Sequence, residues 1–254
     1  MIAINDINSF NPWLVAVLLN TALAIVAWFI PKKLLTPSGL VHAWFLGVLV
    51  WGTLGWPGYV VVLFYFLVGS GVTRINLAQK EAEGIAEKRA GARGPENVWG
   101  SALTGALCAL ATLAVPLVYR ELLLLGYVAS LSTKLSDTCA SEVGKAYGRR
   151  TFLITNLQPV PRGTEGAVSL EGTLAGILGS AAIALVGWAV GLVSLAGVGF
   201  CVLAALIATN LESVIGATLQ SRFDWLTNEV VNILNTLMGA IAAVLMAMVL
   251  QGLT

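Results

Sequence analysis

The residues best suited to chemistry lie in a polar stretch, residues 136–172, of a mostly apolar sequence. Asp137 and Glu142 are five residues apart, and both carboxylates can reach one cation if the helix that carries them frays and bends at its end. Hard divalent ions such as Mg²⁺ bind carboxylate oxygens together with the phosphate oxygens of a substrate. Three nearby hydroxyls could bind a phosphate or a metal-bound water: Ser136, Thr138 and Ser141. In the alternative interpretation, Asp137 caps a helix and Glu142 pairs with Lys145 or Arg149.

A second candidate is the glycine-rich run Pro161–Gly166, which reads PRGTEG. Glycines let backbone N–H groups converge on an anion, and Arg162 can hold a phosphate with the fork of its guanidinium. A helix expected to begin near Ala167 adds a dipole that favours an anion. The same letters also suit an ordinary turn. Phosphate and metal chemistry is the interpretation that uses all the neighbouring acids and bases.

Two later apolar runs each carry polar residues. Asn210, Glu212 and Ser213 interrupt the first, and an ionisable side chain there is costly unless it faces the bundle interior or a wet cavity. The second run has polar residues spaced to share one helix face: Asn228, Asn232 and Asn235. These groups either form a polar knot that holds helices together or face each other across a cavity. We expect the cavity, because two facing stripes are hard to explain as unrelated accidents.

The composition indicates which elements must position these residues. The chain of 254 residues is 57% hydrophobic and 11% charged, with a mean hydropathy of +0.86. Its apolar runs approach the length that crosses a hydrocarbon layer of roughly 30 Å. We therefore predict an all-α, polytopic transmembrane helix bundle that forms a single domain over residues 1–254. The net charge of +1 argues against a nucleic-acid partner, and three scattered cysteines support neither a disulfide framework nor a metal site.

The apolar runs predict about eight helices: 12–30, 40–54, 57–73, 98–118, 121–135, 167–193, 195–219 and 227–253. The turn residues Gly55–Gly58 separate the second from the third, and residues 209–213 interrupt the seventh. If the N-terminus is outside, Arg120 is the one basic residue that falls away from the cytoplasmic side, as the positive-inside rule expects. The long polar segments then share that side, where a soluble metabolite can meet a membrane-dissolved one.

Several sequence blocks resemble the membrane-protein family that includes plant and cyanobacterial phytyl-phosphate kinases. The blocks are ordered along nearly the whole chain: 38–42, 74–100, 137–148, 161–176, 211–220 and 226–232. A weaker likeness links the order of Asp137, Glu142 and the Pro161–Gly166 run to CTP-using membrane enzymes, the phosphatidate cytidylyltransferases and the phytol and dolichol kinases. Those enzymes usually have a lysine-rich block where this chain has Arg162 and Gly163, so phosphate contacts that lysine makes there must be made otherwise here.

The resemblance implies transfer of a γ-phosphoryl group from CTP, or another nucleoside triphosphate, to phytyl monophosphate, which gives the diphosphate used for tocopherol and phylloquinone side chains. The implied Mg²⁺ ligands are Asp137, Glu142 and Glu212. The implied catalytic residues are Asp137, Glu142 and Arg162. The implied nucleotide-binding residues are Ser136, Ser141, Lys145, Arg149, Gly163, Thr164, Glu165, Gly166, Asn210 and Asn228. Basic residues that could bind the acceptor phosphate, or anionic lipid headgroups, are Arg74, Lys80, Lys88, Arg89 and Arg93. An acceptor that is already an anion needs no general base.

The same resemblance implies an integral, multi-pass protein of the plasma membrane or of a thylakoid or other plastid-type internal membrane. Two other functional classes stay open. A cytidylyltransferase would form a CDP-lipid and release pyrophosphate, and a transporter would also explain acids within helices. The transporter is less favoured because the polar groups gather on one side rather than at mid-membrane. The sequence leaves the nucleotide preference, the isoprenoid length and the oligomeric state open.

Overall fold

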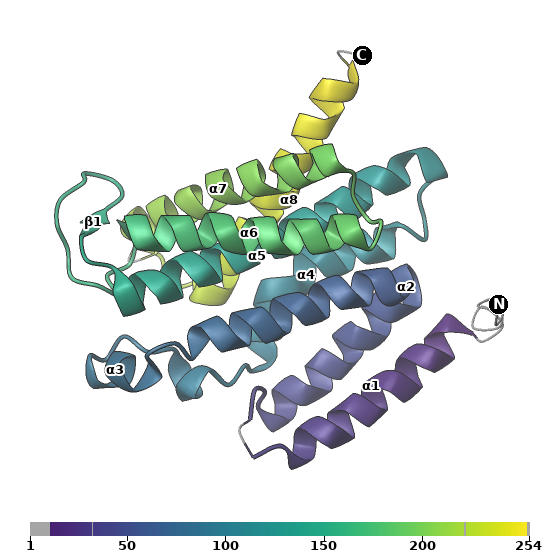
Figure 1. The fold of residues 1–254 in the computed structure, drawn as a ribbon, viewed down its shortest axis with the longest axis horizontal. Helices are drawn as coiled ribbons and strands as arrows, with labels where there is room; N and C mark the ends of the chain where they lie inside the picture. Colours follow the sequence, from purple (N-terminus) through teal and green to yellow (C-terminus); the bar gives the residue numbers. More distant parts are fainter. Residues whose placement is uncertain (1–10, 32, 221, 253–254) are drawn as a thin grey trace.

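The computed structural model describes residues 11–31, 33–220 and 222–252, and it confirms the predicted all-α helix bundle (Figure 1). In chain order, the elements are α1 (Pro12–Phe29), α2 (Pro37–Thr73), α3 (Leu77–Ala82), a 3₁₀ turn (Lys88–Gly91), α4 (Pro95–Ala111), α5 (Leu117–Tyr147), β1 (Thr151–Leu153), β2 (Ala167–Ser169), α6 (Leu170–Ala189), α7 (Leu195–Thr218) and α8 (Asn228–Gly252). Within these ranges, α1, α2, α6, α7 and α8 are long and apolar enough to cross a membrane. The helices that enclose the bundle thus suit a lipid environment.

Helix α5 is the centre of the bundle and packs against α2, α4, α6, α7 and α8. It is buried continuously from Leu125 to Ser136. Glycines on α6 allow the close approach of that helix, because a Cβ on Gly187 would lie 2.8 Å from the Val128 side chain. The polar residues near the end of α5 are therefore held by a helix that is surrounded on all sides.

Helix α2 contains the predicted break between the second and third apolar runs. Gly55 has φ +65° and ψ −158°, a backbone conformation that glycine adopts readily, and Pro57 lacks an N–H to continue the helix ladder. The two runs form two arms that turn back on each other (Figure 1). The second arm brings Tyr65 and Thr73 to the end of the bundle that carries the polar loops.

Several predicted helix ends differ from the structure. Helix α5 continues to Tyr147 rather than ending at Leu135, so the predicted frayed end near Asp137 is wrong. Its polar residues find partners on other segments, which removes the cost of keeping them in a packed helix. Helix α7 runs unbroken through residues 209–213, where an interruption was predicted. Asn210 and Ser213 donate to carbonyls one turn earlier, so local hydrogen bonds satisfy them without unwinding the helix.

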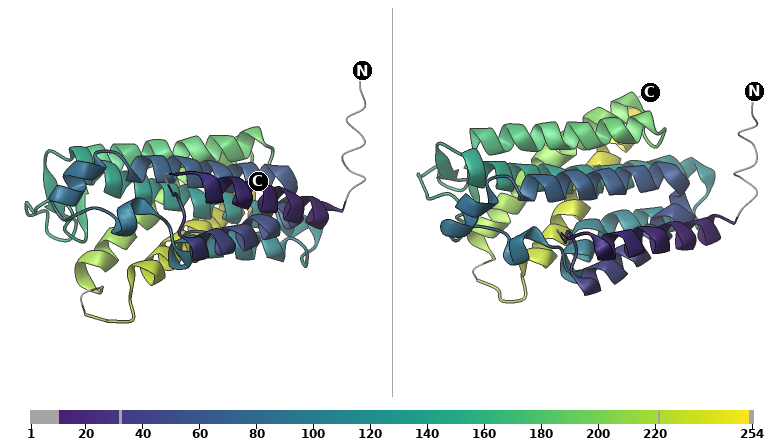
Figure 2. Two further views of the ribbon diagram at one scale, coloured as in Figure 1. Left: turned by 90° about the horizontal axis from the view of Figure 1, so that it is seen from below. Right: turned by 60° about the horizontal axis from the view of Figure 1, so that its bottom comes forward.

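The polar segments gather at one end of the bundle (Figures 1 and 2). Residues 151–153 and 167–169 form an antiparallel pair, β1 with β2, that the sequence analysis did not anticipate. Leu35 and Arg93 form an isolated bridge, which joins the start of α2 to the segment before α4. The expectation that these segments share one side is therefore confirmed, while the side of the membrane that they face stays a prediction. The predicted end of α8 at Leu253 lies outside the described residues.

Candidate functional site

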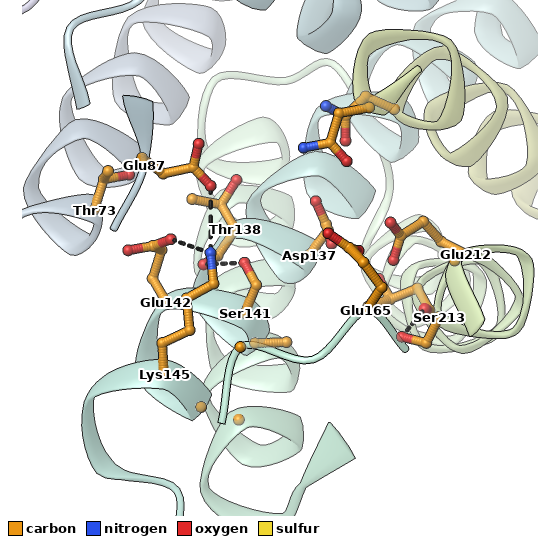
Figure 3. Close-up of a pocket in the computed structure, with 18 of the residues that line it drawn as sticks. Thr73, Glu87, Asp137, Thr138, Ser141, Glu142, Lys145, Glu165, Glu212 and Ser213 are labelled. Atoms are coloured by element: carbon orange, nitrogen blue, oxygen red, sulfur yellow. Dashed lines mark hydrogen bonds and ion pairs between the residues drawn. The ribbon is translucent and has the colours of Figure 1, made fainter. Parts of the chain in front are cut away.

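A cavity of about 740 Å³ lies at the polar end of the bundle (Figure 3). Its wall combines parts of α2, the 84–97 segment, α5, the 163–173 segment, α7 and α8. The predicted site residues that line it are Arg89, Arg93, Ser136, Asp137, Ser141, Glu142, Lys145, Gly163, Thr164, Glu165, Gly166, Asn210, Glu212 and Asn228, together with Lys88. The predicted site residues that stand outside this lining are Arg74, Lys80, Arg149 and Arg162. The expected cavity between the polar residues of α7 and α8 is thus confirmed, except that Asn235 is buried outside its lining.

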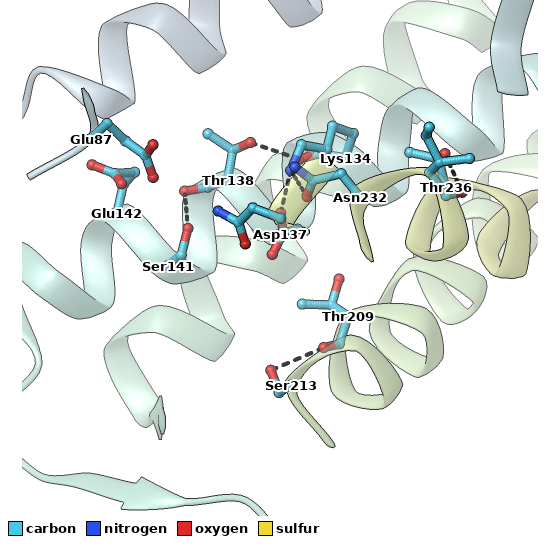
Figure 4. A network of polar contacts seen from close by, with 12 residues as sticks. Glu87, Lys134, Asp137, Thr138, Ser141, Glu142, Thr209, Ser213, Asn232 and Thr236 are labelled. Carbon is cyan, nitrogen blue, oxygen red and sulfur yellow. Dashed lines mark hydrogen bonds and ion pairs between the residues drawn. The ribbon is translucent and has the colours of Figure 1, made fainter. Parts of the chain in front are cut away.

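One side of the cavity is acidic. Asp137 of α5, Glu212 of α7 and Glu165 of the loop before β2 face the same space, and the charge of Glu212 interacts with those of the other two (Figure 3). Lys134 donates to Asp137 Oδ2 over 2.5 Å and to Asn232 Oδ1 of α8 over 2.6 Å (Figure 4). Lys134 therefore neutralises part of the negative charge and fastens α5 to α8.

Glu142 belongs to a separate ionic network on another side of α5 (Figure 3). Lys80 of α3, whose side chain is 1% exposed, donates to Glu142 and, over 2.8 Å, to the Thr73 carbonyl. Lys145 lies 3.4 Å from both Glu142 and Glu87. The alternative interpretation, in which Glu142 pairs with Lys145, is the one observed. The network holds the 73–87 segment against α5.

The structure does not bring the three predicted Mg²⁺ ligands together. Because α5 is helical up to Tyr147, positions 137 and 142 point about 140° apart around its axis. Asp137 and Glu212 share the acidic side, whereas Glu142 is bonded to lysines. Among the described residues, no three His, Cys, Asp or Glu side chains are arranged around a common metal position. The predicted binding of one cation by Asp137 and Glu142 together is therefore not observed.

The acidic side alone has donors that fit a hard divalent cation. Lys134 bonds one of the two oxygens of Asp137, which leaves the other oxygen for a ligand. Mg²⁺ binds one or two carboxylates and takes its remaining ligands from water and substrate phosphates. A divalent cation here would also reduce the repulsion among Asp137, Glu165 and Glu212. One or two of these carboxylates, with Asp137 as the first candidate, rather than Glu142, could hold a metal that takes its other ligands from water and phosphate.

The Pro161–Gly166 run forms the loop before β2 at the cavity edge. Gly163 has φ +82° and Gly166 has φ +75°, so both need the conformational freedom of glycine. Both also pack closely, because a Cβ on Gly163 would lie 2.5 Å from Ile85 and one on Gly166 would lie 2.5 Å from Ala217. Turn geometry and packing thus account for both glycines. Their contact with a phosphate stays a prediction.

The arginines outside the lining have other partners or face away. Arg162 donates to both carboxylate oxygens of Glu83, over 2.8 and 3.0 Å, and so ties the loop before β2 to the end of α3. Arg74 donates to the Lys33 carbonyl over 2.8 Å. Arg149 is exposed at the end of α5. In this conformation none of the three contacts the space in which a triphosphate or an acceptor phosphate would bind.

A second part of the cavity wall, called the basic side, carries Arg89 and Arg93. Arg93 donates from Nη1 to the Tyr65 hydroxyl over 2.6 Å, and its guanidinium lies 5.1 Å from the centre of the Tyr65 ring. Arg89 is paired with Glu96 in the first turn of α4. The hydrogen bond from Arg89 holds the pKa of the Glu96 carboxyl below its ordinary value. The cavity wall therefore carries a group of carboxylates in one part and a guanidinium fixed on an aromatic ring in another.

Sequence reasoning missed two functional residues and one partner. Lys134 lies three residues before Asp137, a spacing that puts the two side chains on one helix face and could have signalled their pairing. Glu87 lies in a run of charged residues, and its spacing from them gave no sign that it pairs with Lys145. Tyr65 lies in the apolar stretch of α2, where a tyrosine is usually an ordinary core residue. No local pattern therefore indicated that Tyr65 contacts Arg93.

A comparison with models of protein families gives a match over residues 20–240 to the family described as Integral membrane protein DUF92. The chain belongs to this family. The matched range contains every residue that lines the cavity. The protein is accordingly an integral membrane protein, as its composition predicted.

Relatives come from cyanobacteria, plants and archaea. The uncharacterized membrane protein sll0875 of Synechocystis sp. is 67% identical over 92% of this chain and 90% of its own length. Protein VTE6, chloroplastic, of Arabidopsis thaliana is 44% identical over 96% of this chain and 75% of its own length. The uncharacterized membrane protein MJ0933 of Methanocaldococcus jannaschii is 32% identical over 88% and 90%. No solved structure matches the chain. The cyanobacterial and plant relatives confirm the family resemblance drawn from the ordered sequence blocks.

Proposed function

We propose that this protein is a phosphotransferase that moves the γ-phosphoryl group of CTP, or of another nucleoside triphosphate, onto phytyl monophosphate or a related isoprenyl monophosphate. The product is the isoprenyl diphosphate that serves tocopherol and phylloquinone synthesis. The single observation that carries the proposal is the cavity at the polar end, whose lining combines the acidic side seen in Figure 3 with the basic side at Arg93. The 44% identity to Protein VTE6 over nearly the whole chain supports the same function.

The place of the cavity suits a reaction between a soluble and a lipid substrate. It lies among the polar loops, yet α2, α7 and α8 on its wall are long enough to cross a membrane. A nucleotide can approach from the water while an isoprenoid chain stays beside the apolar helices. The catalytic task is to bring two anions together and neutralise their charge, and it requires no covalent chemistry by the protein.

We assign the acidic side to the nucleotide and its Mg²⁺. Asp137, with Glu165 or Glu212 beside it, would hold the ion, which when bound neutralises phosphate oxygens and orients the triphosphate. Lys134 keeps Asp137 in its position through the ion pair. Other polar groups that line the cavity are proposed to bind the nucleotide: Ser136, Ser141, Lys145, the Gly163–Gly166 backbone with Thr164, Asn210 and Asn228.

In the proposed reaction, an oxygen of the acceptor phosphate forms a bond to the γ-phosphorus. The bond from the γ-phosphorus to the oxygen that bridges it to the β-phosphorus breaks, and the nucleoside diphosphate leaves with that electron pair. The attacking oxygen already carries negative charge, so no proton has to be removed. The absence of a histidine from the cavity wall within the described residues is consistent with this chemistry.

The test is turnover by the purified protein in lipid nanodiscs with γ-labelled CTP, Mg²⁺ and phytyl monophosphate. Label on the lipid supports the kinase, whereas label in released pyrophosphate identifies a cytidylyltransferase and rules out the proposal. Assays with geranylgeranyl and farnesyl monophosphates, each with ATP, CTP, GTP and UTP, define the preference for the isoprenoid chain and the preference for the nucleotide. A wild-type protein that binds these lipids but transfers no label with any nucleotide would point to a transporter.

A further inference from the structure

Both the backbone and the side chain of Arg93 are fixed by contacts with other segments. Its backbone N–H donates to the Leu34 carbonyl over 3.0 Å, and its carbonyl accepts from the Thr36 N–H over 3.0 Å. Its guanidinium is fixed by the Tyr65 hydroxyl and lies against the Tyr65 ring, with the Phe66 ring centre 6.0 Å away. Both the backbone and the side chain of Arg93 are therefore oriented before any ligand binds.

Arg93 also differs from the other cavity cations in its charge balance. Three other cations of the cavity wall are each bonded to a carboxylate: Arg89 to Glu96, Lys134 to Asp137, and Lys145 to Glu87 and Glu142. Arg93 has no bonded carboxylate among the residues that the structure describes. Lys88 has none either, but it is exposed, so water can solvate its ammonium. Arg93 is partly buried against α2, where a bound anion would compensate its charge best.

The geometry fits a phosphate. A guanidinium presents five N–H donors in a fork, and the Tyr65 hydroxyl occupies one nitrogen of Arg93. The remaining donors can bond two phosphate oxygens at once. The charge of Lys134 also acts on the Tyr65 hydroxyl, so a second cation lies nearby, on the side toward Asp137. An anion at Arg93 would thus face the acidic side across Lys134.

The arrangement distinguishes the two phosphate-bearing substrates. The acidic side, with Asp137, Glu165 and Glu212, repels a bare phosphate and favours one that arrives with Mg²⁺, which is the nucleotide. A phosphate monoester without a metal is favoured on the basic side. Arg93 packs on Tyr65 of α2, a helix long and apolar enough to cross a membrane, so a lipid-borne phosphate can reach it from the bilayer.

We propose that Arg93, oriented by Tyr65, binds the phosphate of the isoprenyl monophosphate acceptor. This assignment rests on the proposed kinase function. It selects Arg93 from the basic residues of the 74–97 segment, because Lys80 is buried in an ion pair, Arg74 bonds a carbonyl and Arg89 bonds Glu96. Arg93 contacts the substrate in this proposal, and Tyr65 is a positioning residue.

The experiment compares Arg93→Gln, Tyr65→Phe and Gly69→Ala with wild type in nanodiscs. Gly69→Ala is informative because its Cβ would lie 2.8 Å from Arg93 Nη2, so it displaces the guanidinium and leaves the charge in place. Loss of a charge-assisted phosphate contact predicts a rise in the KM for phytyl monophosphate of about 10- to 100-fold in Arg93→Gln. The other two variants should show smaller rises. The KM for CTP should stay within about twofold of wild type.

Arg150→Gln is the matched control, since Arg150 is exposed and outside the cavity lining. A merely structural role of Arg93 would lower thermal stability and change both KM values together. Equal rises for lipid and nucleotide, or an unchanged lipid KM, would overturn the assignment. If Arg93→Gln fails to fold, Tyr65→Phe and Gly69→Ala decide the question by the same split between the two KM values.

Equilibrium binding separates failure of the assignment from failure of the proposed function. Labelled phytyl monophosphate is titrated onto wild type and Arg93→Gln without nucleotide, with inorganic phosphate and phytol as competitors. Competition by phosphate that is weaker in Arg93→Gln identifies phosphate recognition at Arg93, and competition by phytol alone contradicts it. A wild type that transfers no phosphoryl group refutes the kinase, whereas an active wild type with unchanged lipid binding in Arg93→Gln refutes only the subsite.

Discussion

The Lys80–Glu142 ion pair provides the most direct test of which carboxylates stabilise the fold and which are available to bind a ligand. The two side chains are 1% and 2% exposed, and Lys145 is the other cation near Glu142, at 3.4 Å. Substituting Glu142 by Gln removes the carboxylate and leaves the buried Lys80 ammonium with the Thr73 carbonyl as its acceptor. Because its carboxylate is bonded to two lysines, we expect Glu142 to stabilise the fold rather than to bind a metal.

The magnitude follows from the burial of the pair. Removing one partner of a buried ion pair costs about 3–5 kcal/mol, because the remaining charge is left uncompensated. The Thr73 carbonyl still accepts from Lys80, so we expect the lower end, about 3 kcal/mol for Glu142→Gln. For a chain of this size that corresponds to a fall in Tm of about 6–12 °C. Glu87→Gln is the control, since its side chain is 41% exposed and its loss should cost about 1 kcal/mol or less.

The assay is thermal unfolding of the detergent-solubilised protein, followed by the fluorescence of its eight tryptophans, together with phosphoryl transfer measured well below Tm. The double variant Lys80→Met/Glu142→Met should recover part of the lost stability, because an apolar pair leaves no buried charge. The structural reasoning is refuted if Glu142→Gln melts like the wild type and loses its activity. That result would instead support the metal-ligand role that the sequence alone suggested.

Three further outcomes are expected. Asp137→Asn should reduce phosphoryl transfer by at least about 100-fold while lipid binding persists, because charge stabilisation at the transferred group is lost; isothermal titration with the Mg²⁺–nucleotide complex checks the step at which it fails. Gly166→Ala should cost about 3 kcal/mol in unfolding free energy, since its φ is +75° and its Cβ would meet Ala217 at 2.5 Å. Gly191→Ala, with φ +78° and open space around it, should cost about 1–2 kcal/mol, and equal costs would exclude the packing explanation. Arg162→Gln breaks the pair with Glu83 and should speed proteolysis in the loop before β2, with little change in Tm because the pair is a third exposed; an inactive variant with an intact loop would restore Arg162 to the catalytic set.

The sequence predicted the class of the protein and the end at which its chemistry lies. Composition alone indicated a polytopic helix bundle, because each apolar run has to be long enough for a bilayer whatever its neighbours are. Gly55 and Pro57 indicated the bend in α2, since turn chemistry depends on the residue itself. The polar stripes of α7 and α8 indicated a cavity between them because ionisable groups in apolar helices need a wet or paired environment. These inferences depend on one residue or one helix at a time.

Which side chains pair with each other depends on more than one helix, and the tertiary structure alone decided it. Glu142 is bonded to Lys80, 62 residues earlier in the chain, and Arg93 is fixed by Tyr65, 28 residues earlier. Neither partner is marked by local spacing, because it is the rotation of each helix in the bundle that sets which side chains meet. The length of α5 was misjudged for the same reason: its polar residues favour a loop when considered alone, and a buried helix once Lys80, Asn232 and Lys145 compensate them. The sequence thus determined which groups must avoid lipid, and the packing of helices around α5 determined which of those groups share an acidic side, a basic side or an ion pair.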